Sequence, residues 1–268
     1  MTPSDVIHLW PDTSPNTPAE GERPRLEVYL PEGAPAVPRG AVVVLPGGGY
    51  NHLAAHEGEP FGRFFAGLGL VGAVCRYRVA PHRFPAAYAD AARAVRLLRS
   101  LAARYAIDPE RVAMIGFSAG AHLAATVGTQ PDLVHDPEDD LAASRSARPN
   151  RLILAYGALS MQPGGNPGLG TTLFGEEVTE EQRAMVSAEL HVTEDSPPAF
   201  LFHTADDPRE PVANSIRFFD ACRGQGVPAE IHVYESGRHG VGLAADNPRL
   251  RSWMGLVIDW LADWRDSA

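Results

Sequence analysis

Nearly continuous apolar runs, separated by segments with apolar residues at helical spacing, are the main pattern along this chain. Such runs show little polar alternation, which is typical of strands buried on both faces of a sheet; they lie at residues 41–45, 71–75, 112–115, 151–156, 199–203 and 231–234. Helices are expected at residues 60–68, 85–105, 119–127, 214–222 and 250–264. Strands that alternate with helices predict an α/β fold, with a mostly parallel sheet covered by helices on both faces.

Both ends of the chain and one internal segment depart from this pattern. Residues 1–24 are polar and rich in proline, and we expect them to form an extended arm before a single domain of residues 25–268. Leu26–Leu30 alternates enough to be an edge strand. Residues 160–195 are rich in glycine and proline at first and then helical in pattern at 179–190, which indicates a short cap-like insertion beside the functional site.

Composition excludes several classes of function. The 268 residues carry a net charge of −10, so nucleic acid and anionic membrane surfaces are poor partners. No apolar run approaches the ~20 residues of a membrane span, and the first ten residues lack the features of a secretory signal. We therefore expect a cytoplasmic protein with no nucleic-acid or membrane partner; the sequence does not predict its oligomeric state.

Two residue types narrow the chemistry further. The chain contains no lysine, which excludes Schiff-base and Ser-Lys mechanisms because both need a lysine amine. The two cysteines, Cys75 and Cys222, fall in a predicted strand and a predicted helix. We expect both to be buried free thiols rather than a disulfide.

The pattern G-x-S-x-G occurs at Gly116–Gly120, directly after the apolar run 112–115. A strand that turns sharply into a helix can hold a serine in an exposed and strained position, and small flanking residues let the turn close. Ser118 is therefore the candidate nucleophile. A glycine-rich turn with a chance serine is the alternative, and the motifs described next argue against it.

A glycine loop follows the predicted strand 41–45, at Pro46–Tyr50. An oxyanion needs backbone N–H donors aimed at it, and glycines let the backbone approach closely. In an elbow of this type one donor is the residue after the nucleophile, here Ala119, and the other lies in such a loop, here Gly48 or Gly49. Tyr50, which ends the loop, is expected to contact substrate.

A base and an acid follow the nucleophile in the order Ser, Asp, His. His239 follows the predicted strand 231–234, and it would take the proton of Ser118. Two aspartates, Asp206 and Asp207, follow the strand 199–203, and periodicity does not choose between them. Asp207 precedes Pro211 by four residues, the spacing usual in hydrolases with an Asp-x-x-x-Pro loop, so we prefer Asp207 and expect Asp206 to cap the loop.

Other histidines form weaker patterns. His52 and His56 could share a helix face and bind zinc, but the general-base glutamate of H-E-x-x-H is missing. We expect neither a metal nor a cofactor. His122 lies one helical turn after Ser118 and should pack in the interior, and His203 should be a buried, hydrogen-bonded ring.

Together these motifs resemble the acetyl-esterase and xylan-esterase group of α/β-hydrolases. The resemblance extends from about residue 41 to the C-terminus and rests on Pro46–Tyr50, Tyr77-Arg78, Asp90, Ala94–Arg96, Asp108-Pro109, Gly116–Leu123 and His203–Asp207. It implies a triad of Ser118, Asp207 and His239 with an oxyanion hole of Gly48, Gly49 and Ala119. Two positions depart from the family: Ala121 replaces a second glycine, and Arg209-Glu210 replaces an apolar pair before Pro211.

The expected function is hydrolysis of short-chain acyl esters, above all acetyl esters of sugars or xylo-oligosaccharides. A general short-chain carboxylesterase or a feruloyl esterase is the alternative within the same chemistry. A peptidase usually carries a large extra domain or an acidic specificity pocket, for which this chain has no room. A non-catalytic binding protein on this scaffold typically lacks a triad member, and here all three are present.

Overall fold

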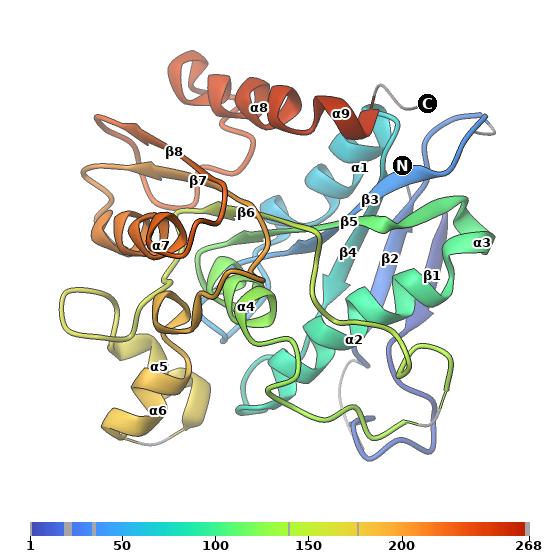
Figure 1. Ribbon diagram of the computed structural model, residues 1–268, viewed down its shortest axis with the longest axis horizontal. Coiled ribbons are helices and arrows are strands. Elements are labelled where there is room, and N and C mark those ends of the chain that lie inside the picture. Colours follow the sequence, from blue (N-terminus) through green and yellow to red (C-terminus); the bar gives the residue numbers. More distant parts are fainter. Residues whose placement is uncertain (1, 19–22, 34–35, 139, 176, 266–268) are drawn as a thin grey trace.

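The computed structural model describes residues 2–18, 23–33, 36–138, 140–175 and 177–265. Three of the expected segments therefore lie partly outside the described residues: the arm (1 and 19–22), the insertion (176) and the C-terminus (266–268). Eight strands form one sheet in the order β1-β2-β4-β3-β5-β6-β7-β8 (Figure 1). They are β1 (Asp5–His8), β2 (Arg25–Tyr29), β3 (Arg39–Leu45), β4 (Val71–Arg76), β5 (Ile107–Phe117), β6 (Arg151–Ala155), β7 (Ala199–Thr204) and β8 (Ala229–Tyr234).

The sheet is mostly parallel, as predicted. The six strands from β4 to β8 in the sheet order pair in parallel, whereas β2 runs antiparallel to both β1 and β4. The chain passes from β3 to β4 on one side and then to β5 on the other side of β3. Ligands of such sheets bind at the carboxyl ends of the strands where the order reverses, which here is the edge beside β3 and β5.

Helices cover both faces. Helices α1 (Glu59–Gly67), α8 (Pro248–Trp260) and α9 (Ala262–Arg265) pack on one face, and α2 (Ala86–Ser100), α3 (Ala102–Tyr105), α4 (Ala119–Thr129) and α7 (Ala213–Gly224) pack on the other (Figure 1). Strand β3 shows why its run is apolar throughout, since Val43 joins one core cluster and its neighbour Val44 joins the other. Cys75 and Cys222 are buried free thiols, which confirms that prediction.

The N-terminal segment differs from the expectation. Residues 5–8 form β1 and pair with β2, with Asp5 opposite Val28, so they belong to the sheet rather than to an extended arm. The prediction that Leu26–Leu30 is an edge strand is therefore wrong, because β1 covers that edge. The Asp5 carboxylate accepts a hydrogen bond of 2.7 Å from the Tyr105 hydroxyl, which ties β1 to α3.

Two predicted helices are each divided into two. The segment 85–105 breaks at Leu101, whose torsions (φ −96°, ψ 13°) leave the helical region, and α3 then ends at Ala106 with φ 51°. This turn directs the chain into β5, which begins at Ile107, earlier than predicted. The segment 250–264 breaks in the same way at Leu261 (φ −98°, ψ 9°).

The insertion between β6 and β7 contains two short helices, α5 (Gly168–Phe174) and α6 (Glu180–Met185), and a 3₁₀ turn at Ala188–His191. The helical pattern expected at 179–190 corresponds to α6 and this turn. Helix α6 begins with a capping box, in which Thr179 accepts from the Gln182 N–H and the Gln182 side chain accepts from the Thr179 N–H. The insertion lies at the carboxyl end of β6, beside the edge where the site is expected.

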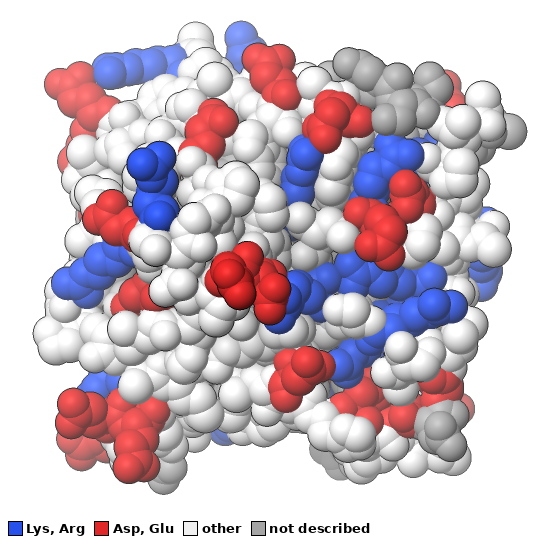
Figure 2. Space-filling model, in the orientation of Figure 1, with Lys and Arg blue, Asp and Glu red and all other residues white. Residues whose placement is uncertain are grey.

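Arginines of α2 account for much of the charge pairing in the core. Arg93 is buried and contacts Asp136 at 3.2 Å, and Arg96 contacts the same carboxylate at 3.6 Å. On the face drawn in Figure 2, arginine and acidic side chains lie next to one another. These two pairs hold Asp136, which lies between α4 and β6, to helix α2. Within the described ranges, no helix has the length and apolar character that a membrane span requires.

Candidate active site

The serine elbow joins β5 to α4. Ser118 has φ 52° and ψ −117°, a conformation that residues with a side chain rarely adopt. The flanking glycines permit it, because a Cβ on Gly116 would lie 2.2 Å from the Gly120 carbonyl oxygen, and a Cβ on Gly120 would lie 2.1 Å from the carbonyl oxygen of Leu45. The Ser118 N–H donates to the Ala155 carbonyl at 3.0 Å, which fixes the turn to the next strand.

His239 and Asp207 reach the serine from two neighbouring loops. The Nε2 atom of His239 lies 2.9 Å from the Ser118 Oγ, and its Nδ1 lies 2.8 Å from the Asp207 Oδ2. An ionised carboxylate can only accept, so Nδ1 carries the proton and Nε2 is free to accept from the serine hydroxyl. The loops after β5, β7 and β8 therefore bring together the three residues that the sequence selected.

The backbone of its own loop stabilises the ionised form of Asp207 by hydrogen bonds. Its second oxygen accepts from the N–H groups of Arg209 at 2.8 Å and Glu210 at 3.0 Å. Burial alone would raise the pKa of Asp207, but the hydrogen bonds from His239, Glu210 and Arg209 outweigh burial, and the pKa lies below its ordinary value. Asp206 instead accepts from the Gly237 N–H at 2.8 Å and links the acid loop to the histidine loop.

The glycine loop after β3 packs directly against the elbow. A Cβ on Gly47 would lie 2.7 Å from the Phe117 carbonyl oxygen and 3.1 Å from the Ser118 Cβ. Gly48 has φ 127° and Gly49 has φ 62°, both in the region that favours glycine. Within the described part of the chain, the N–H groups of Gly48, Gly49 and Ala119 have no hydrogen-bond acceptor. Gly48 and Gly49 line the same cleft as Ser118, and Ala119 follows Ser118 directly in the chain.

The structure argues against the substrate contact that we expected of Tyr50. Its side chain is buried, and its hydroxyl lies 2.7 Å from Nδ1 of His122. The other ring nitrogen of His122 lies 2.7 Å from the Val186 carbonyl oxygen, so that nitrogen carries the proton and Tyr50 donates. Burial lowers the pKa of His122 to about 4, so the ring is neutral. The hydrogen bond between Tyr50 and His122 anchors the end of the glycine loop to helix α4.

A cleft of about 600 Å³ opens over Ser118. Ten of its fifteen lining residues are polar or charged in type, although carbon atoms make up more than half of the lining surface, and the insertion supplies one wall through Asn166 and Leu169. The other lining residues come from the loops after β3, β5, β7 and β8, and they include Gly48, Asn51, His52, Arg209, Glu210 and Arg238. No group of three or more metal-ligating side chains occurs among the described residues, and His56 contacts the Gly240 carbonyl at 3.0 Å.

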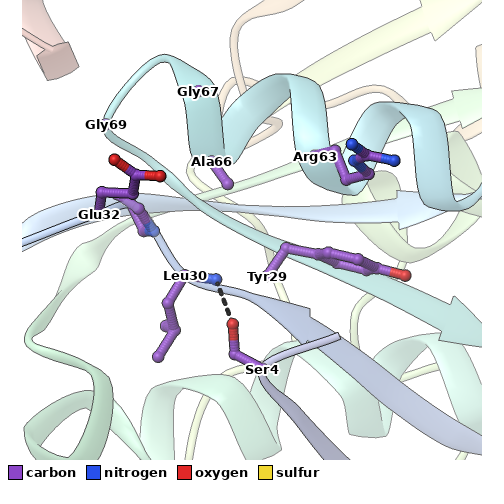
Figure 3. A pocket seen from close by; sticks show the side chains of 9 residues that line it. Ser4, Tyr29, Leu30, Glu32, Arg63, Ala66, Gly67 and Gly69 are labelled. Carbon is purple, nitrogen blue, oxygen red and sulfur yellow. Dashed lines mark hydrogen bonds between the residues drawn. The ribbon is translucent and has the colours of Figure 1, made fainter. Parts of the chain in front are cut away.

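A second cavity, of about 410 Å³, shares no lining residue with the cleft over Ser118 (Figure 3). Tyr29, Leu30 and Glu32 at the end of β2 line it together with Arg63 and Ala66 of α1, and the Ser4 hydroxyl accepts from the Leu30 N–H at 3.2 Å. No residue of the serine site lines it. The cleft over Ser118 is therefore the candidate site.

Residues 26–221 match the model of the family described as BD-FAE. The chain belongs to this family. It is 32% identical over 246 residues to endo-1,4-beta-xylanase B of Butyrivibrio fibrisolvens, covering 89% of this chain and 38% of that protein. It is also 30% identical over 229 residues to the acetylxylan esterase of Xylanibacter ruminicola, covering 80% of this chain and 43% of that protein.

A solved structure resembles this chain over almost its whole length. The acetyl ester-xyloside bifunctional hydrolase from Caldicellulosiruptor lactoaceticus superposes with a TM-score of 0.91 at 35% identity, covering 98% of this chain and 97% of that one. The fold is therefore that of an α/β-hydrolase, as the resemblance implied. By contrast, the chain spans only about two fifths of the length of the two relatives named above.

Two buried glutamates that lie near the candidate site were not selected as site residues from the sequence. Glu57 accepts from the Gly47 N–H and from the Tyr156 hydroxyl, each at 2.8 Å. Glu210 accepts from the Asn166 side chain at 2.7 Å. Their sequence context gives little signal, because their partners lie far away along the chain. For Glu210, the departure from the family's apolar pair was the available clue.

Glu210 has an unusual electrostatic environment. Burial raises its pKa to about 7, against the lowering effects of the Asn166 hydrogen bond and the nearby His239. The Asn214 amide nitrogen lies 3.4 Å from its second oxygen, and the Asn214 Oδ1 is buried with no partner among the described residues. A protonated Glu210 could donate to that oxygen once the amide turns over, whereas an ionised Glu210 could not.

Replacement of Glu210 by glutamine should therefore change how stability depends on pH. The folded pKa of about 7 exceeds the ordinary value of 4.5, so the folded state binds more protons between these pH values and wild-type stability falls as pH rises. Glu210→Gln, which mimics the protonated form, should unfold near the wild-type Tm at pH 5 and above it at pH 8. The gain at pH 8 should reach at most about 3 kcal/mol.

Thermal unfolding across this pH range measures the difference. Glu194→Gln, which removes an exposed carboxylate, serves as the matched control and should shift Tm little at either pH. A Tm difference between Glu210→Gln and wild type that does not vary with pH would contradict the raised pKa.

Proposed function

We propose that this chain is a serine esterase that removes short acyl groups, above all acetyl groups, from xylo-oligosaccharides or related sugars. The observation that carries the proposal is the hydrogen-bonded series from Ser118 through His239 to Asp207, at 2.9 and 2.8 Å. Neither a metal nor a cofactor takes part in this chemistry. The cytoplasmic location expected from the sequence stays a prediction.

In the acylation step, the Ser118 Oγ attacks the ester carbonyl carbon while Nε2 of His239 takes the hydroxyl proton. Asp207 holds the imidazole in the required tautomer and stabilises the imidazolium. The negative oxygen of the tetrahedral intermediate accepts from the N–H of Ala119 and from those of Gly48 and Gly49. When the intermediate collapses, the sugar oxygen leaves with the proton of His239 and the acyl group stays on Ser118.

Deacylation repeats these steps with water. His239 removes a proton from a water molecule, whose oxygen attacks the acyl carbon and forms a second oxyanion in the same site. Collapse returns the proton to the Ser118 Oγ and releases the carboxylic acid. The N-terminus of α4 begins at Ala119, so the positive end of its dipole supports both intermediates.

Two observations favour a sugar as the alcohol. The cleft lining is rich in groups that hydrogen-bond hydroxyls, among them Asn51, Asn166 and Arg238. In addition, the names of the relatives refer to acetylxylan and to acetyl ester-xylosides. Among the described lining residues only Leu169 and Ala54 have wholly apolar side chains, which favours a short acyl group over a long fatty chain.

Ser118→Ala should abolish hydrolysis while the protein stays folded, since the change removes the nucleophile and little volume. Loss of a triad member typically lowers turnover about 10⁴-fold or more. Initial rates with p-nitrophenyl acetate and labelling by a serine-directed phosphonate measure the effect. A variant that keeps more than about a hundredth of the wild-type rate would contradict the proposed nucleophile.

Asp207→Asn and Asp206→Asn form a matched pair that tests the acid. The first change should lower kcat by roughly 10³-fold or more, because asparagine favours the wrong histidine tautomer. The second weakens one bond to the Gly237 N–H and should lower kcat far less. If the larger loss follows Asp206, the two roles are exchanged.

Acyl chain length tests the substrate. The value of kcat/KM should be highest from acetyl to butyryl and fall steeply by octanoyl, because each unburied methylene forgoes roughly 0.8 kcal/mol. A p-nitrophenyl ester series, measured beside acetylated xylo-oligosaccharides and methyl ferulate, separates sugar esterase, general carboxylesterase and feruloyl esterase. A value of kcat/KM that rises up to the decanoyl ester would indicate an apolar tunnel for the acyl chain and would contradict the proposed sugar-esterase function.

A further inference from the structure

Glu57 is a buried carboxylate that lies between the glycine loop after β3 and the histidine loop after β8. Catalysis by Ser118 would require both loops to be held in place. Glu57 ends the 3₁₀ turn Ala55–Glu57, shortly after the glycine loop, and is 2% exposed. A buried carboxylate loses several kcal/mol of hydration, so its retention calls for compensating hydrogen bonds. Both of its oxygens have such bonds: Oε2 accepts from the Gly47 N–H and Oε1 accepts from the Tyr156 hydroxyl, each at 2.8 Å.

The first bond holds the glycine loop against the nucleophile. A Cβ on Gly47 would lie 2.8 Å from the Glu57 Oε2 on one side and 3.1 Å from the Ser118 Cβ on another. Gly47 is thus enclosed between the carboxylate and the elbow. The N–H groups of Gly48 and Gly49 follow directly, so the position of Gly47 sets where those donors can lie.

The second bond extends to the histidine loop. The Tyr156 hydroxyl donates to Glu57 and accepts from the Gly242 N–H at 3.1 Å, and its ring meets the His239 ring edge-on at 5.3 Å. Tyr156 itself has φ 39°, an unfavourable conformation for a tyrosine. This strain places the phenol where it contacts all three groups.

A third link runs through the neighbouring residue. The Nε2 atom of His56 lies 3.0 Å from the Gly240 carbonyl oxygen, one residue after His239, and 3.4 Å from the Glu57 Oε1. His56 and Glu57 therefore connect Gly47 on one side to Gly240 directly, and to Gly242 through the Tyr156 hydroxyl, on the other. No other described carboxylate hydrogen-bonds to the glycine loop and also reaches the histidine loop.

We propose that Glu57 is a positioning residue that fixes the distance between the oxyanion donors and the catalytic base, and so controls kcat rather than substrate affinity. The inference rests on the proposed serine-esterase function. An oxyanion exists only in the intermediates and the transition states that lead to them. Displaced donors therefore lower kcat and kcat/KM together and leave KM nearly unchanged.

The test compares Glu57→Gln and Glu57→Ala with wild type on p-nitrophenyl acetate. Glutamine keeps the volume and one acceptor oxygen, so it should fold, lose about 10- to 100-fold in kcat and change KM less than about twofold. Alanine should lose more. Glu27→Gln is the matched control, because Glu27 is also a buried glutamate but pairs with Arg25 and Arg76 in β2 and β4. It should change Tm and leave kcat near wild type.

Tyr156→Phe supplies a second, independent variant. If Glu57 and Tyr156 act as one unit, the double variant Glu57→Gln/Tyr156→Phe should lose much less kcat than the product of the two single losses. Multiplicative losses would show that the residues act separately and would overturn the link to the histidine loop. A Glu57→Gln enzyme with wild-type kcat and a lowered Tm would overturn the proposal and leave Glu57 a structural anchor.

Failure of the proposed function would look different. In that case wild-type protein would not hydrolyse the ester, or Ser118→Ala would retain the activity, whatever happens at Glu57. Phosphonate labelling of Ser118 provides the second readout, because it also passes through a negatively charged oxygen in the same site. Its rate should fall in Glu57→Gln and stay near wild type in Glu27→Gln.

Discussion

The backbone conformation of Ser118 is the constraint on which the rest of the site depends. A residue with a side chain at φ 52° and ψ −117° is strained by about 1–3 kcal/mol, and the surrounding packing must hold it there. Strand β5, helix α4 and the loop after β3 approach so closely that Gly116 and Gly120 have no room for a Cβ. This packing presents the hydroxyl at the carboxyl edge of the sheet and the Ala119 N–H beside it.

Once the serine is fixed, the remaining groups must reach it from other strands. The loops after β3, β7 and β8 supply donors, acid and base, and all of them leave the same edge of a parallel sheet. Polar side chains tie these loops to one another: Asp206 links the acid and histidine loops, Glu57 binds the glycine loop and the Tyr156 hydroxyl, and His56 contacts the histidine loop. Buried hydrogen bonds of this kind make the arrangement rigid before substrate arrives.

The sequence predicted those features that depend on short stretches of the chain, namely the central strands and the residues around Ser118. Apolar runs such as 41–45 and 112–115 identified the central strands, because a strand buried on both faces leaves no polar position. The elbow, the glycine loop and the order of acid and base identified Ser118, His239 and Asp207, which the structure brings together. The choice of Asp207 over Asp206 rested on its spacing from Pro211, and the two carboxylates do point to different partners.

What the sequence missed depends on contacts between distant residues. Pairing of β1 with β2 joins a segment recognised as a strand to Asp5–His8, which lies in the proline-rich stretch that we expected to be an arm, so the edge strand was misassigned. Tyr50 was expected to contact substrate because it ends the glycine loop, yet its side chain turns inward to His122, 72 residues later. Glu57 accepts a hydrogen bond from Tyr156, which lies 99 residues later in the chain, and no local sequence pattern predicts a contact between residues so far apart.

Chemistry and substrate selection fall on different segments of this molecule. The reacting groups belong to loops fixed by sheet and elbow, whereas one wall of the cleft, with Asn166 and Leu169, belongs to the insertion after β6. Asn166 is held by Glu210, a residue of the acid loop whose backbone also supports Asp207. The insertion is therefore coupled to the loop of Asp207 through Glu210, so a change at Asn166 reaches that loop while the elbow stays intact. Glu210 belongs to the pair Arg209-Glu210 that departs from the family pattern, and the departure thus falls where the wall of the cleft meets the loop of the proposed acid.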